Sequence, residues 1–336
     1  MNRVALLLLS IGAALFIALL AWQGLGAITT ALAAAGWGLA LVALVHAVPL
    51  AFDAGAIAVL FRRRDRVDLR DALVARWISE SVNSLLPAGQ IGGPVVMVRQ
   101  LSQRGMRMGD AAAAIMVSTT LQAVAQILFA VSGIVLFCVH TANHASRNLG
   151  IAAAIATVVL SSIIALFYVA QRRGLFGRTL RFASRVFGKR DWSGLTNHAD
   201  SIDIAVKALY RERRKAAASF ALSLVAWFVG TVEVWLALRF LGHPVGWIDA
   251  LLLESVGQAI RGAAFAIPGS LGVQEGGYLL LAPLVGLPPD AALALSLAKR
   301  AREILLGLPG LLYLHFSERN WQRRRAVRVP AVEAVD

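Results

Sequence analysis

Long uninterrupted runs of apolar residues dominate the sequence and predict membrane-spanning helices. About 20 apolar residues are needed to cross the hydrocarbon core of a bilayer. Six runs are long enough, at residues 4–22, 37–60, 111–139, 149–170, 216–240 and 291–316. We expect each to be one full span. The first is expected to stay uncleaved, because the Ala21-Trp22-Gln23 that follows it makes a poor signal-peptide cleavage site.

Two further apolar stretches are interrupted near their middle by proline and glycine. They lie at residues 71–98 and 249–285. Proline removes a helix hydrogen bond, so neither stretch fits a simple span. Broken backbone at membrane depth is stable only inside protein or beside a water-filled cavity. We therefore predict two re-entrant helical hairpins, with tips at Leu86-Pro87-Ala88-Gly89 and Ile267-Pro268-Gly269-Ser270.

Basic residues between the apolar runs predict the orientation of the chain. They gather in the segments 62–66, 99–107, 171–215 and 319–325, which all fall on one side if there are six crossings. The opposite loops contain a single arginine, Arg147. The positive-inside rule then places both termini in the cytoplasm, at a bacterial inner membrane.

The long basic segment also has an apolar pattern of its own. Apolar residues recur at helical spacing in 176–187 and in 195–209. This pattern predicts two amphipathic helices that lie on the cytoplasmic leaflet. An ordinary basic loop is the alternative; it would explain the charge but not the apolar stripe.

The composition agrees with a membrane protein and excludes several other classes. Of 336 residues, 58% are hydrophobic and 15% charged, against about 25% charged in soluble domains. The net charge of +14 comes from residues between the apolar runs, so topology explains it better than nucleic-acid binding. Cys138 is the only cysteine, and His140 and His144 lack a third ligand nearby. We predict no disulfide, metal site or cofactor.

An internal repeat is visible at an offset near 180 residues. Asp71-Ala72-Leu73 matches Asp249-Ala250-Leu251, Pro87 matches Pro268, and Asp110-Ala111-Ala112 matches Asp290-Ala291-Ala292. Each half then contains span, span, hairpin and span, and the three crossings in each half invert the second relative to the first. Inverted repeats with broken helices are typical of secondary transporters.

The resulting fold is an all-α polytopic membrane protein with six full spans and two re-entrant helical hairpins. Residues 1–140 form the first repeat, with its hairpin on the cytoplasmic side. Residues 141–316 form the second, with its hairpin on the outer side and the amphipathic segment 171–215 in the cytoplasm. Residues 317–336 are a basic cytoplasmic tail.

Charged residues inside these apolar segments are candidates for a functional site, because each costs at least ~2.5–3.5 kcal/mol at mid-depth. In the first hairpin, Arg76, Glu80 and Asn83 share one helical face, and Arg76 can neutralise Glu80. In the second, Glu254, Gln258 and Arg261 repeat that spacing with the charges reversed. Internal salt bridges that hold the hairpins are the alternative interpretation.

A group of cations in the last span is the strongest candidate for ligand binding. Lys299, Arg300 and Arg302 stand beside a single acid in sequence, Glu303. The excess positive charge could bind an anionic group such as a lipid phosphate, for which arginine has a matching pair of donors. Equally, the cluster could neutralise acids of neighbouring segments, Glu233, Glu254 and Glu275.

The full set of predicted substrate-binding residues is Arg76, Glu80, Asn83, Gln90, Gln122, Gln126, Arg261, Glu275, Arg300, Arg302 and Glu303. Asp53 and Glu233 interrupt otherwise apolar spans and are candidate proton carriers.

Three motifs resemble a known family. They are ESVNSLLPAGQIGG at residues 80–93, PGSLGVQEG at 268–276 and RARE at 300–303. Together they are similar to the membrane domain of lysylphosphatidylglycerol synthase and flippase proteins, over residues 5–316, and most similar to the stand-alone branch associated with hopanoid biosynthesis. The resemblance implies translocation of a lipid, with hopanoid or anionic phospholipid as cargo.

The function expected from this resemblance is a lipid flippase or lipid transporter rather than an enzyme. The aminoacyltransferase domain that follows the membrane region in full-length synthases is not expected here, so lipid aminoacylation by this polypeptide is not expected either. Two alternatives stay open. One is a membrane enzyme that acts on a lipid-linked phosphate, and the other is a non-transporting partner that recruits lipid-synthesising enzymes through segment 171–215.

Overall fold

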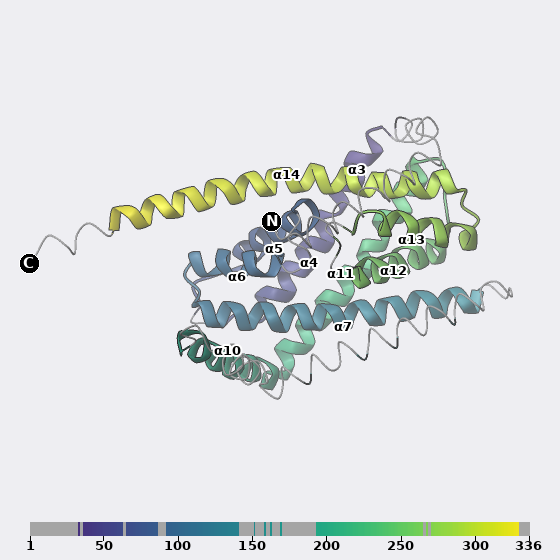
Figure 1. Cartoon of the computed structure of the whole chain (residues 1–336). Coiled ribbons are helices and arrows are strands. Elements are labelled where there is room, and N and C mark those ends of the chain that lie inside the picture. Colours follow the sequence, from purple (N-terminus) through teal and green to yellow (C-terminus); the bar gives the residue numbers. More distant parts are fainter. Residues whose placement is uncertain are drawn as a thin grey trace, which may run out of the picture.

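The structure is a computed structural model that describes residues 36–62, 65–86, 92–140, 193–264 and 270–328, with isolated positions at 33, 151, 158, 162, 169 and 267. Throughout these ranges the regular structure is helical, as expected (Figure 1). Several predictions lie outside the described residues: the span 4–22, most of the span 149–170, the helix 176–187, Gln90, and the tip residues Pro87, Gly89, Pro268 and Gly269.

Three of the expected spans are present as apolar helices of membrane length. They are the nearly continuous pair α3 (Gly38–Val45) and α4 (Ala47–Ala58), then α7 (Met108–His140) and α11 (Arg213–Phe240). The expected span 291–316 lies within α14 (Pro289–Arg328), a single helix of 40 residues that is not among these three. Large apolar side chains are exposed on these helices, for example Leu44, Val135, Leu308 and Leu312. Such a surface suits lipid, so the chain is a membrane protein.

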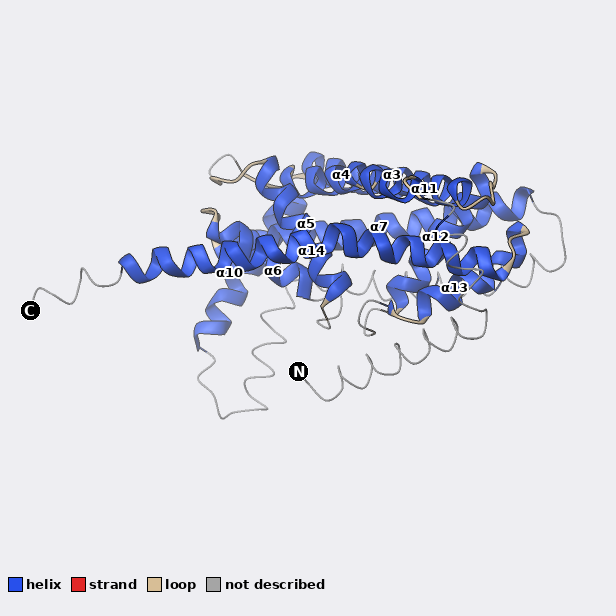
Figure 2. Ribbon diagram, turned by 90° about the horizontal axis from the view of Figure 1, so that it is seen from above, coloured by secondary structure: helices blue, strands red, loops and turns tan. Residues whose placement is uncertain are grey.

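Two shorter pairs of helices occupy the places of the predicted hairpins. The first pair is α5 (Leu69–Leu85) and α6 (Gly92–Gln103); the second is α12 (Trp247–Ala263) and α13 (Val273–Leu281), followed by the 3₁₀ turn η3 (Ala282–Val285). Within each pair the two helices pack against each other. Figures 1 and 2 show the first pair toward one end of α7 and the second pair toward the other end.

Each pair packs on a long helix of the other half of the chain: α5 on α14, and α12 on α7. Small residues allow both close approaches. A Cβ added at Gly310 of α14 would overlap Ser81 of α5, and one added at Gly133 of α7 would overlap Ser255 of α12. The indole Nε1 of Trp77 also donates to the carbonyl of Leu306, at 2.9 Å, one turn before Gly310.

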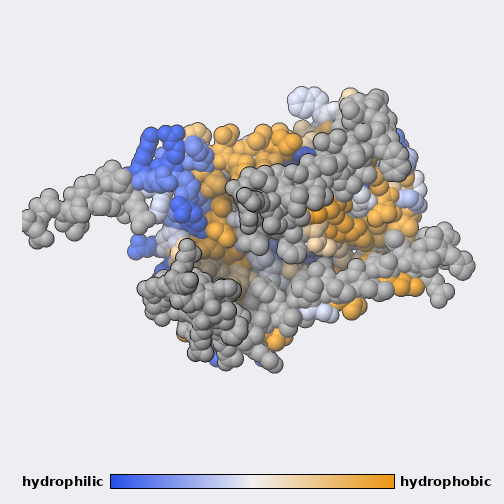
Figure 3. Space-filling view, in the orientation of Figure 1, coloured by the Kyte–Doolittle hydropathy of each residue, from blue (hydrophilic) through white to orange (hydrophobic). Residues whose placement is uncertain are grey.

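The basic segments gather at one end of the molecule, as the predicted orientation requires. Arg99 of α6 lies 2.6 Å from Glu318 near the end of α14, and Arg62 lies 3.7 Å from Asp110 at the start of α7. Figure 3 shows hydrophilic atoms at this end and hydrophobic atoms along the middle. The described parts of three segments far apart in sequence, 62–66, 99–107 and 319–325, therefore share one side.

The amphipathic segment 195–209 is helical, as predicted. It lies in α10 (Ser193–Arg211), which packs on α7. Val206 and Leu209 are 1% and 3% exposed, within a core that also contains residues of α4 to α7. Protein rather than lipid therefore covers this part of the apolar stripe; the side chains of Leu195 and Ala199 lie outside the described residues.

Candidate functional site

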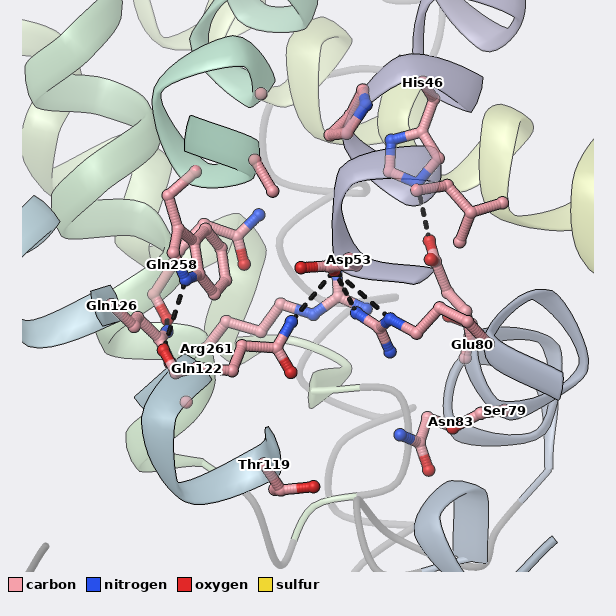
Figure 4. Close-up of a pocket in the computed structure, with 18 of the residues that line it drawn as sticks. His46, Asp53, Ser79, Glu80, Asn83, Thr119, Gln122, Gln126, Gln258 and Arg261 are labelled. Carbon is pink, nitrogen blue, oxygen red and sulfur yellow. Dashed lines mark hydrogen bonds and ion pairs between the residues drawn. The ribbon is translucent and has the colours of Figure 1, made fainter. Parts of the chain in front are cut away.

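A polar cavity of about 350 Å³ lies between the two helix pairs, inside an otherwise apolar bundle. This volume is within the range of roughly 300–1,000 Å³ that small-ligand pockets occupy. The polar lining comes from the α3–α4 junction and from α4, α5, α7, α11, α12 and α14 (Figure 4). Its main members are His46, Asp53, Arg76, Glu80, Asn83, Gln122, Gln126, Glu233, Glu254, Gln258, Arg261 and Arg302.

The face of α5 that carries Arg76, Glu80 and Asn83 lines the cavity as predicted, but the ion pair within it is a different one. Arg76 binds Asp53 of α4, with Nη2 at 2.7 Å from Oδ2. The same Asp53 oxygen accepts from Gln122 Nε2 at 2.9 Å. Asn83 Oδ1 accepts from the backbone N–H of Gly93, at 2.8 Å, and so ties the start of α6 to α5.

Glu80 binds His46, a residue that the sequence analysis did not select. His46 lies between α3 and α4, with Nε2 2.7 Å from Glu80 and Nδ1 2.8 Å from Glu233. An ionised carboxylate can only accept, so both ring nitrogens carry a proton when both bonds are made, and His46 is then an imidazolium. Arg302 contacts the same ring and lies 3.1 Å from Glu233.

The matching face of α12 is bound in the same manner to α14. Glu254 lies 2.6 Å from Lys299, whose side chain is 1% exposed, and it also accepts from Gln258 Nε2 at 2.8 Å. Arg261 lies 2.6 Å from Glu303. Gln126 of α7 donates to the backbone carbonyl of Gln258 at 2.8 Å, which closes the wall between α7 and α12 (Figure 4).

The expected excess of positive charge on α14 is wrong for the described residues, because acids from other helices lie against each cation. Arg300 is 3.2 Å from Glu275, and Arg302 is 3.1 Å from Glu233. Of the two interpretations left open, neutralisation of the acids of the second half is the one that the geometry supports.

Not every predicted residue lines the cavity. Glu275 accepts from the backbone N–H of Gly272 at 2.7 Å and from Ser296 Oγ at 2.9 Å, and Arg300 donates to the carbonyl of Ser270 at 3.3 Å. These contacts hold the start of α13 against α14. Glu275 and Arg300 therefore support the second helix pair rather than line the cavity, and Glu303 lies behind Arg261.

The buried network is close to electrical balance. Among the described residues it contains five cations, Arg76, Arg261, Lys299, Arg300 and Arg302, and six acids, Asp53, Glu80, Glu233, Glu254, Glu275 and Glu303. A protonated His46 supplies the sixth positive charge. Buried charges are stable only when they are paired and hydrogen-bonded. Each of these charges has an oppositely charged neighbour, although Glu233 Oε1, Glu303 Oε1 and Arg302 Nε make no hydrogen bond.

Comparison with known families gives one match over most of the chain. The model of the family described as Lysylphosphatidylglycerol synthase TM region matches residues 6–310. The matched range includes both helix pairs and every residue of the cavity wall. No curated protein and no solved structure matches the chain.

Proposed function

The chain belongs to the family defined by the transmembrane region of lysylphosphatidylglycerol synthase, and we propose that it moves a lipid between the leaflets of a bacterial inner membrane without changing it chemically. The cargo would be a hopanoid or a phospholipid, handled by a flippase or lipid transporter. Its partner would then be a membrane lipid. Lipid-synthesising enzymes would be its neighbours in the membrane.

One observation carries the proposal: a polar cavity of about 350 Å³ inside an apolar bundle. A lipid that changes leaflet must carry its polar headgroup through hydrocarbon, where unsatisfied polar groups cost several kcal/mol each. Donors and acceptors inside the bundle can replace water for the headgroup during that passage. The acyl or ring portion can stay in the bilayer, beside exposed apolar residues such as Val135 and Leu308.

The arrangement of the helices supports an inverted repeat. The first pair packs on α14 and the second on α7, while α4 packs on α11 near the middle. Figure 1 shows α7 and α14 running in opposite directions, with the two pairs toward opposite ends. In the proposed topology the pairs are re-entrant hairpins that enter from opposite sides, there are six full spans, and both termini are cytoplasmic. Two equivalent conformations would then open the cavity to either leaflet.

Proton coupling is part of the proposed mechanism. Asp53 and Glu233 were selected from sequence as proton carriers, and both lie on the cavity wall. His46 connects Glu233 to Glu80 and so joins α11 to α5. A proton that leaves His46 would release one of these two bonds and loosen the first helix pair from the second half.

Leaflet exchange in reconstituted vesicles tests this function. Vesicles would contain the full chain and a lipid with a fluorescent acyl chain, and a membrane-impermeant quencher added outside would report the lipid that reaches the outer leaflet. We expect quenching beyond half of the signal with the protein and not with empty vesicles. Thin-layer chromatography of the same lipid should show no product. Absence of exchange for every lipid tried would refute transport, and a new product would favour an enzyme.

A further inference from the structure

The arginines that line the cavity each form an ion pair with a carboxylate of the protein. Among the described residues, Arg76, Arg261 and Arg302 line the cavity, and each lies 2.6–3.1 Å from an acid. These acids already neutralise the arginines, so an anionic headgroup would add an uncompensated negative charge to a low-dielectric cavity, which is unfavourable.

The amide side chains on the cavity wall suit a ligand with hydroxyl groups rather than an anionic one. Gln122 donates its amide N–H to Asp53, Gln126 to the carbonyl of Gln258, and Gln258 to Glu254. Each of these partners can only accept, so the nitrogen of each amide is the bonded atom. Each amide keeps its carbonyl oxygen as an acceptor and its second N–H as a donor. Hydroxyls both donate and accept and so suit both atoms, whereas phosphate oxygens only accept.

From these two observations we infer that the cavity binds a hydroxyl-rich lipid headgroup that carries no net charge. The inference rests on the proposed function and names the substrate class of its site. The carbonyl oxygens of Gln122, Gln126 and Gln258 accept from the headgroup hydroxyls, and the ion pairs around them keep the wall neutral.

Three probe lipids with the same fluorescent acyl chain separate the effect of headgroup charge from the effect of headgroup hydroxyls. They are a glucosyl diacylglycerol, which is uncharged and rich in hydroxyls; phosphatidylglycerol, which has hydroxyls but is anionic; and phosphatidylcholine, which is neutral overall but has no donor. We expect the glucolipid to be exchanged at least about tenfold faster than either phospholipid. Phosphatidylglycerol moving as fast would overturn the neutral-charge requirement, and phosphatidylcholine moving as fast would overturn the role of the hydroxyls.

Binding of the three lipids in competition is measured separately, on the detergent-solubilised full chain, by native mass spectrometry. This measurement keeps the inference separate from the proposed function. If no lipid is exchanged but the glucolipid still binds best, transport is refuted and the headgroup class stands. If phosphatidylglycerol binds best, the inference fails whatever the exchange assay shows.

Variants that change the charge of the cavity wall should change the order of preference among the three lipids, which a loss of folding would not do. Asp53→Asn leaves Arg76 without its acid, so the preference should shift toward phosphatidylglycerol by about tenfold or more, equivalent to ~1.4 kcal/mol. The double variant Asp53→Asn with Arg76→Gln should restore the original order. Asp110→Asn is the matched control, because Asp110 pairs with Arg107 outside the cavity. An unchanged order in Asp53→Asn would overturn the inference.

Discussion

Replacing Glu254 by glutamine removes the nearest acid from a fully buried lysine and tests how much the ion pair between α12 and α14 contributes to stability. Lys299 Nζ is 2.6 Å from Glu254 and 3.8 Å from Glu233, and its side chain is 1% exposed. With an effective dielectric constant near 20, these distances correspond to attractions of about 6 and about 4 kcal/mol. Glu233 cannot fully replace Glu254 as the partner of Lys299, because it also binds Arg302 and His46.

We therefore expect Glu254→Gln to lower the free energy of unfolding by about 3–5 kcal/mol, the usual cost of leaving one buried charge unpaired. At roughly 2–4 °C per kcal/mol, the melting temperature should fall by at least ~6 °C. The fall would be followed by size-exclusion chromatography of the heated, detergent-solubilised protein. The matched control is Glu318→Gln, which removes the partner of Arg99 at the exposed end of α14 and should cost at most about 1 kcal/mol.

A double variant decides whether the loss comes from the unpaired charge. Glu254→Gln with Lys299→Met removes both charges, and we expect it to recover most of the stability that the single variant loses. A single variant as stable as the original chain would refute the reasoning, because Lys299 would then have another adequate partner. A double variant no better than the single one would show that the contact matters for packing rather than for charge.

Three further predictions concern packing, pH and topology. Gly310→Leu should separate α5 from α14 and lower the yield of folded protein, measured by size-exclusion chromatography, because a Cβ at this position already overlaps Ser81. His46→Gln should flatten the pH dependence of lipid exchange between about pH 5 and 8, and exposed His315→Gln should not; equal profiles would leave His46 a structural role only. In a cysteine-free background, Trp247→Cys should react with an impermeant maleimide in intact cells, and Met108→Cys only after the membrane is opened; the reverse pattern would refute the orientation.

The apolar helices could be predicted from sequence because their signal is local. The runs 37–60, 111–139 and 216–240 each exceed the membrane length, and α3–α4, α7 and α11 occupy them. The two helix pairs were also recognisable, since proline and glycine interrupt apolar sequence there. The outcome for α10 marks the limit of such patterns. An apolar stripe shows that one face of a helix must be covered, but it does not tell whether lipid or protein covers it.

The partners in the cavity could not be predicted from helical spacing. Arg76 and Glu80 are four residues apart on α5, which favours a pair in an isolated helix. Both instead point into the cavity and bind residues of other helices, Asp53 and His46. His46 gave only a weak signal, because a lone histidine in an apolar span is usually structural. Its two carboxylates are 34 and 187 residues away in sequence.

The net charge of α14 cannot be read from its own segment alone. Lys299, Arg300 and Arg302 outnumber Glu303 within their own segment, which suggested free positive charge. In a low-dielectric interior, however, a charge is neutralised by whatever acid the fold brings near, regardless of its distance in sequence. The ionisable residues of all the apolar segments therefore have to be considered together, and among the described residues of the buried network they are five cations against six acids. Such a near-balance is typical of a paired network around the cavity, and the proposed preference for an uncharged headgroup rests on that pairing.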